Sequence, residues 1–234
     1  MRRAAVLLAA LVAAGGARAE PDDFVTAPDR LSDEAFYRLV ACGAPPGEGC
    51  VKPMARWVRA ADEAITVALA APDPGFPGYR LGDASAALDD AIAQIAGTGA
   101  AVPLVRLADG AAADITVFLS GAAHGETLLR TGFPGLDGQV IAGGLMTFWA
   151  REGRIERAGI ALSRDLPRRT IRSVLLEELV QALGLATDVR GPAYLRASIF
   201  DEDSNTVTRL DGQDAEAVRR HYPAPAVPQS SASR

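Results

Sequence analysis

Residues 170–188 of this 234-residue chain read TIRSVLLEELVQALGLATD, and this stretch decides the fold. Thr170 is placed to cap a helix that runs to about Leu185. At 100° per residue, one arc of that helix collects five apolar side chains: Ile171, Val174, Leu175, Ala182 and Leu185. A helix with so continuous an apolar arc is expected to be largely buried.

Glu178 falls inside the same apolar arc, and Glu177 and Gln181 lie together at its edge. A carboxylate in such a place must be paired, hydrogen-bonded or protonated, because an isolated buried charge is too costly. The pattern is typical of a functional site, but a structural ion pair produces it equally well. Arginines that are available as partners are Arg168, Arg169, Arg172 and Arg196.

Short apolar runs and turn signals precede and follow this helix. They predict strands at residues 65–69, 102–107 and 115–119, and a hairpin that joins 146–150 to 155–162. Further helices are expected from Ser32 to about Ala41, from Asp83 or Ser85 onward, and over residues 212–221. This order of elements predicts a single α/β (α+β) domain with a mixed twisted sheet.

The two ends of the chain have a different composition from the middle. Residues 1–19 combine Arg2 and Arg3, an apolar run and an Ala-Arg-Ala cleavage site, which predicts a signal peptide and export to the periplasm or beyond. Residues 20–35 form a polar leader, 36–222 the domain, and 223–234 a Pro/Ser/Ala tail that we expect to be disordered. No other segment is apolar and long enough to be a transmembrane helix.

Cys42 and Cys50 are the two cysteines, and a turn-forming Gly/Pro spacer separates them. An exported protein favours a disulfide between them. The alternative, a catalytic thiol, needs an activating base, and neither His124 nor His221 is near in sequence.

Charge and histidine content exclude several function classes. The chain has 24 basic and 29 acidic residues, and the arginines of the signal peptide make the remainder still more acidic. Such a protein has no electrostatic reason to bind nucleic acid or anionic lipid. Two histidines are too few for a zinc site of three imidazoles.

The helix resembles the H-E-x-x-H-x-x-G-x-x-H helix of metzincin zinc peptidases with its histidines replaced. Glu178 matches the catalytic glutamate and Gly184 the glycine of the turn, while the zinc-ligand positions hold Glu177, Gln181 and Thr187. Downstream, residues 198–200 (Ser-Ile-Phe) are similar to the Met-turn, with phenylalanine in place of methionine. The resemblance implies a metzincin-like domain that contains a helix of the active-site type and a C-terminal helix.

A closer resemblance is to the bacterial secreted "domain of unknown function 2927" family. Its features here are the E-E-x-x-Q-x-L-G-L pattern, the segment 36–42 and the Gly-Gln-Asp of residues 212–214. This family implies a fold but no established activity.

Two functions remain open at this point. In the first, the domain is a non-catalytic pseudo-peptidase without metal or cofactor, and its partner is an unidentified protein or peptide. Glu177, Glu178 and Gln181 would then form a hydrogen-bonded network. In the second, Glu177, Gln181 and Asp188 supply oxygen ligands to Mg²⁺, Ca²⁺ or Mn²⁺, and Glu178 acts as the general base of a hydrolase.

Overall fold

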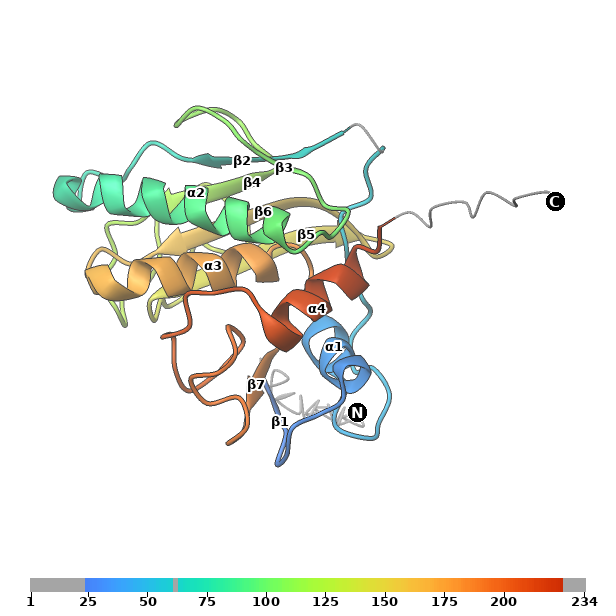
Figure 1. Cartoon of the computed structure of the whole chain (residues 1–234). Helices are drawn as coiled ribbons and strands as arrows, with labels where there is room; N and C mark the ends of the chain where they lie inside the picture. Colours follow the sequence, from blue (N-terminus) through green and yellow to red (C-terminus); the bar gives the residue numbers. More distant parts are fainter. Residues whose placement is uncertain (1–23, 61–62, 225–234) are drawn as a thin grey trace, which may run out of the picture.

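A computed structural model describes residues 24–60 and 63–224, and a five-stranded sheet with the order β3-β2-β4-β6-β5 lies at its centre (Figure 1). The strands are β2 (Ile65–Leu69), β3 (Leu104–Arg106), β4 (Ile115–Leu119), β5 (Gly144–Arg151) and β6 (Arg154–Leu162). All neighbouring strands are parallel except β5, which forms an antiparallel hairpin with β6. The sheet is therefore mixed, with β5 at one edge and β3 at the other.

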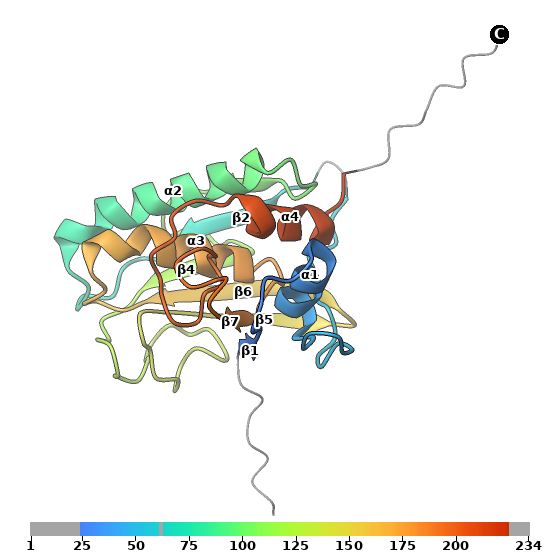
Figure 2. The same ribbon diagram turned by 60° about the horizontal axis from the view of Figure 1, so that its bottom comes forward.

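Two helices cover one face of this sheet: α2 (Leu81–Gly97) and α3 (Ile171–Gln181) lie side by side on it (Figures 1 and 2). Each follows a 3₁₀ turn, η1 (Gly78–Arg80) or η2 (Arg168–Thr170). Alternate residues of the strands point toward the helices, as Ile160 and Leu162 of β6 do. The helices and these residues form the main core.

The opposite face of the sheet is covered by the long segment 120–143 and not by a helix. Its buried side chains Leu128, Leu136 and Ile141 pack around Ala161, which lies between Ile160 and Leu162 on β6 and points the other way. The two faces of one strand thus belong to two separate apolar clusters.

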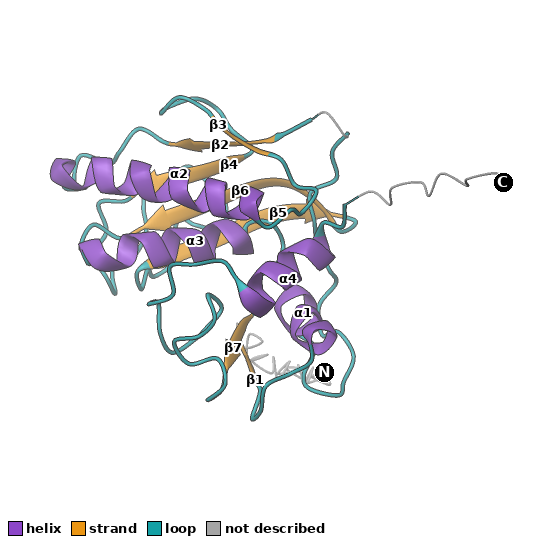
Figure 3. Cartoon of the chain, in the orientation of Figure 1, coloured by secondary structure: helices purple, strands orange, loops and turns teal. Residues whose placement is uncertain are grey.

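The remaining elements gather beside the sheet (Figure 3). Helices α1 (Asp33–Cys42) and α4 (Gly212–His221) pack against each other. Below them, β1 (Phe24–Thr26) and β7 (Asp188–Arg190) form a two-stranded parallel sheet. Ser32 caps α1 as predicted, its Oγ accepting from the Ala35 amide.

The mixed α/β fold class predicted from the sequence is confirmed, and so are the strands 65–69 and 115–119 and the hairpin. The disulfide between Cys42 and Cys50 is present. Within the described residues, no helix has the length and apolar character needed to cross a membrane. The predicted signal peptide lies outside the described residues, as does the tail beyond residue 224.

Several details differ from the sequence prediction, and the strand predicted at residues 102–107 is confined to Leu104–Arg106. α2 begins at Leu81, so Asp83 and Ser85 lie inside its first turns instead of capping it. β1 lies within the segment expected to be a polar leader, where pairing with β7 holds it. α3 ends at Gln181 and not near Leu185, because Gly184 has a φ of +107° and passes so close to the Ala55 carbonyl that no side chain fits there.

Candidate functional site

The acidic pair of α3 is buried, as the sequence predicts for Glu178. Glu177 is 7% exposed and Glu178 is 8% exposed, in a helix that packs against both α2 and β5. Thr170 precedes α3, but its side chain makes no cap bond to the helix; its hydroxyl donates to the Pro167 carbonyl at 2.8 Å. The helix is thus held by packing, and the two carboxyl groups are buried with it.

The Glu178 carboxyl lies against Gly144, the first residue of β5. A Cβ at residue 144 would overlap this carboxyl and the Val174 side chain, so the position requires glycine. No side chain or amide of the described residues donates a hydrogen bond to Glu178. Burial, followed by the nearby charge of Asp188, raises the pKa of Glu178 to about 8. Glu178 is therefore mostly protonated at neutral pH.

Glu177 has a hydrogen-bond partner that Glu178 lacks. The amide of Asn205 donates to its Oε2. Burial, then the charges of Asp188 and Glu178, nevertheless raise the pKa of Glu177 well above its usual value. The two neighbouring carboxyl groups are therefore both poor at carrying charge.

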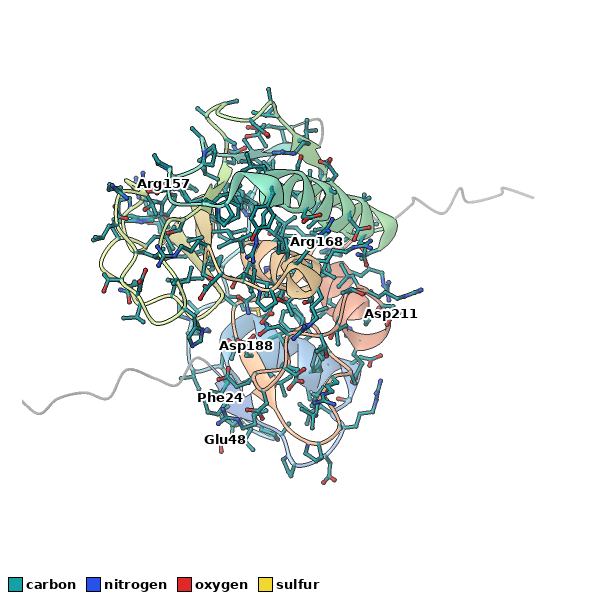
Figure 4. All side chains as sticks on the ribbon, turned by 90° about the vertical axis from the view of Figure 1, so that its left-hand side faces the viewer. Phe24, Glu48, Arg157, Arg168, Asp188 and Asp211 are labelled. Atoms are coloured by element: carbon teal, nitrogen blue, oxygen red, sulfur yellow. A yellow bond between two sulfur atoms is a disulfide. The ribbon has the colours of Figure 1, made fainter. Side chains whose placement is uncertain are left out.

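Gln181 joins α3 to the next strand. Its Nε2 donates to Oδ1 of Asp188, the first residue of β7, at 2.8 Å. Asp188 can be located in Figure 4, which labels it. Together with the bond from Asn205 to Glu177, this contact ties α3 to β7 and to the segment after it. Glu177, Gln181 and Asp188 are thus brought together.

Thr187 is not part of this group. Its side chain is buried and lies against Gly43, and its backbone amide donates to the Val40 carbonyl. The Thr187 hydroxyl has no hydrogen-bond partner in the described part of the chain. The third position of the metzincin-like pattern therefore faces α1 and the disulfide loop.

These residues do not fit a zinc ion. The aligned positions supply a carboxyl, an amide and a hydroxyl where zinc prefers imidazole or thiolate, and two of the three already bond to protein groups. In residues 24–60 and 63–224, no three or more His, Cys, Asp and Glu side chains form a group that could hold a metal ion.

The segment that resembles the Met-turn donates hydrogen bonds to a buried acid of α4. Asp214 of α4 accepts hydrogen bonds from the Ser198 hydroxyl at 2.7 Å and from the Ile199 amide at 2.8 Å. Phe200 is fully buried and packs edge-on against Phe36 of α1. Residues 198–200 therefore fix the position of α4 through Asp214 and contact α1 through Phe200.

Sequence reasoning missed two residues of the site. Asn205, which binds Glu177, is 28 residues away along the chain. Lys52, the single lysine of the chain, reaches across from the disulfide loop, and its Nζ donates to the Ala186 carbonyl at 2.7 Å. Each is the only residue of its type in the sequence, and this rarity was the only signal. Their contacts could not be predicted, because helical periodicity says nothing about partners from distant segments.

Comparison with known proteins gives a family match and distant similarities to solved structures. A family model described as "Protein of unknown function (DUF2927)" matches residues 50–225. No curated protein matches the sequence. Among solved structures, the chain is similar to high choriolytic enzyme 1, a hatching-enzyme zinc protease from the medaka fish Oryzias latipes, at 15% sequence identity and a TM-score of 0.28. That similarity covers 55% of this chain and 48% of the protease, so the chain spans about half the length of the protein it matches.

Proposed function

This chain belongs to the DUF2927 family of proteins of unknown function, and we propose that it is an exported, non-catalytic domain in which the polar residues of α3 serve structure and binding. Export rests on the composition of residues 1–19, as argued from the sequence. The non-catalytic role rests on the contacts of α3.

One observation carries the proposal: two of the three side chains in the zinc-ligand positions, Glu177 and Gln181, are hydrogen-bonded to other side chains of the protein. Gln181 donates to Asp188, and Asn205 donates to Glu177. Hydrogen-bonded polar groups of this kind fix the relative position of the elements that carry them. The cluster therefore joins α3, β7 and the segment that contains Asn205.

A binding role needs a surface, and the outer edge of β5 supplies one beside the cluster. β5 is at the end of the sheet order, so in the described part of the chain no strand pairs with its outer side. It is eight residues long, and Trp149 on it is 48% exposed. Such an edge accepts an extended peptide as an added strand. A protein or peptide partner is therefore the class that fits.

One observation favours the alternative, a hydrolase with an oxygen-ligand metal centre. Glu178 has a pKa of about 8 and no donor among the described residues, and a pKa near the working pH suits a general acid or base. Glu177, Gln181 and Asp188 would be the oxygen ligands. Against this, Gln181 and Asp188 already bond to each other. The non-catalytic function is therefore the better supported.

A peptide-cleavage assay tests the choice between the two. The mature chain and Glu178→Gln are incubated with a mixture of quenched fluorescent peptides, with Zn²⁺, Mg²⁺, Ca²⁺ or Mn²⁺ added in turn. Glu156→Gln, which alters an exposed carboxylate on β6, is the matched control. We expect no cleavage that distinguishes Glu178→Gln from the other two proteins.

Cleavage by the mature chain and by Glu156→Gln that disappears in Glu178→Gln would contradict the proposal. It would assign Glu178 to a reaction, because the substitution keeps the shape of the protonated side chain and removes only its ability to exchange a proton.

A further inference from the structure

A cavity of about 520 Å³ lies at the C-terminal end of α4, and no residue of the α3 cluster lines it. Figure 1 shows the end of α4 beside the chain that leads into β2, and this is where the cavity opens. Its walls come from the segment before β2, from the segment between α2 and β3, and from His221, Tyr222 and Pro223. Its volume is in the range of small-molecule sites, about 300–1,000 Å³.

The walls of the cavity are mostly apolar. Trp57, Ile65, Val102 and Tyr222 line it and are buried. The polar atoms of the two aromatic residues are already used: Trp57 Nε1 donates to the Ala182 carbonyl at 2.9 Å, and the Tyr222 hydroxyl donates to the Leu183 carbonyl at 2.6 Å. Trp57 and Tyr222 can therefore contact a ligand through their aromatic rings and not through hydrogen bonds.

Two arginines line the cavity, and their situations differ. Arg59 donates to Asp114 at 2.5 Å and to Glu63 at 2.9 Å, and its guanidinium lies 5.3 Å from the centre of the Trp57 ring. Arg56 is exposed, and its guanidinium makes no ion pair or hydrogen bond within the described residues. Arg59 is held by two carboxylates, so among the described wall residues Arg56 is the one whose guanidinium can meet a ligand.

His221, which also lines the cavity, carries no charge of its own. The Nε2–H of His221 donates to the Ala55 carbonyl at 2.9 Å, and its Nδ1 is 3.3 Å from the Tyr37 hydroxyl. Burial, with the nearby positive charge of Arg56 as a smaller cause in the same direction, lowers the pKa of His221 to about 4. The ring is neutral at physiological pH, so Arg56 is the one charged group among the described wall residues that has no ion pair.

We propose that this cavity binds a small carboxylate with an aromatic or aliphatic body. The body lies against Trp57, Val102 and Tyr222, and the carboxylate meets the guanidinium of Arg56. A guanidinium matches a carboxylate in planar geometry. A cationic ligand would be repelled by Arg56, and a ligand with several charges would leave some of them against apolar walls. This site is independent of the function proposed for α3.

The two tryptophans of the chain make the binding measurable. Trp149→Phe, on β5 and outside the residues that line the cavity, leaves Trp57 as the single tryptophan, so its fluorescence reports occupancy. Phenylbutyrate is titrated into this protein, and phenylbutyramide, which has the same body without the charge, is titrated in parallel. We expect a saturable change in Trp57 fluorescence with the carboxylate and affinity lower by about tenfold or more for the amide.

Arg56→Gln in the same background should weaken phenylbutyrate binding by about tenfold or more and leave the amide unaffected. Arg154→Gln is the matched control, because Arg154 pairs with Arg56 across a β-bridge and is exposed but does not line the cavity. It should bind like the parent. Both arginines are exposed, so neither variant should unfold.

Three results would overturn the proposal. The first is no saturable change up to millimolar phenylbutyrate. The second is equal affinity for the acid and the amide, or for the parent and Arg56→Gln. The third is binding that appears only after residues 225–234 are removed, since the chain's own end would then be the occupant.

Discussion

Glu178 of α3 and Asp214 of α4 are equally buried acids in very different surroundings. Glu178 is 8% exposed and Asp214 is 4% exposed. Asp214 accepts two hydrogen bonds, from Ser198 and Ile199, which oppose the effect of burial and leave its pKa at about 6. Glu178 accepts none from the described residues, and its pKa rises to about 8. Burial alone therefore does not distinguish a carboxyl group that is hydrogen-bonded to the fold from one that has no donor.

The buried acids of α4 and α3 therefore have different roles in the fold. Asp214 of α4 holds the turn at residues 198–200 in place by accepting hydrogen bonds from Ser198 and Ile199. The acid of α3 lies in a cluster whose other members, Glu177, Gln181 and Asp188, are bonded, while Glu178 contributes only its volume beside Gly144.

Asp214→Ala should destabilise the protein most. It leaves the Ser198 hydroxyl and the Ile199 amide buried without an acceptor, and we expect the free energy of unfolding to fall by about 3 kcal/mol. Urea unfolding measures the loss. Asp211→Ala, at an exposed position of the same helix start, should stay within about 0.5 kcal/mol of the parent. Equal effects of the two would show that the bonds to Asp214 are unimportant.

Glu178→Gln should remove a pH dependence rather than a contact. Because the folded protein binds the Glu178 proton more tightly than the unfolded chain does, stability falls as pH rises from 4.5 to about 8. The expected slope is about 1.4 kcal/mol per pH unit, so Glu178→Gln should gain about 2 kcal/mol on the parent between roughly pH 5.5 and 7. Unfolding curves at several pH values check this, and parallel curves for the two proteins would contradict it.

His221 should give a pH dependence of the opposite sign in the other region. Its pKa is lowered to about 4, so the unfolded chain binds the proton more tightly and stability is lost as pH falls from 6.5 toward 4. The slope is again about 1.4 kcal/mol per pH unit, over a lower range than for Glu178. NMR titration of the ring should place its pKa near 4. A ring that titrates above pH 6 would show that burial does not keep it neutral.

Gln181→Ala should have the smallest effect of the series. Its bond to Asp188 is partly exposed, and a single hydrogen bond of this kind contributes about 1 kcal/mol to the free energy of unfolding. Gln139→Ala, at an exposed position of the 120–143 segment, is the control and should have almost no effect. A loss as large as that of Asp214→Ala would mean that the α3 cluster, and not the turn at Asp214, is the main polar anchor.

The same contrast explains how much the sequence could predict. Helical periodicity is local, so it placed Glu178 in the buried arc of α3 and gave most of the elements around it. The donors of Asp214 lie 16 and 15 residues away and the Asn205 partner of Glu177 lies 28 residues away, and no local pattern encodes them. The end of α3 at Gln181 depends on the backbone of Ala55, and the three-residue pairing of β1 with β7 is too short for an alternation to show.

Arg157 shows the same limit on the sheet face away from α2 and α3 (Figure 4). Its guanidinium lies 5.4 Å from the centre of the Phe133 ring and 5.0 Å from that of Trp149. Phe133 comes from the loop that covers this face and Trp149 from β5. Aromatic rings from two segments thus hold the Arg157 guanidinium, and the sequence alone does not predict these contacts.

The metal content of the mature chain, purified without chelator and without a nickel column, tests the central claim most directly. If the polar cluster of α3 is a hydrogen-bonded network that joins elements, mass spectrometry should find no stoichiometric metal, and the melting temperature should not respond to a chelator. A stoichiometric metal that is lost in Glu177→Ala or in Gln181→Ala would contradict the account and make α3 the centre of an enzyme.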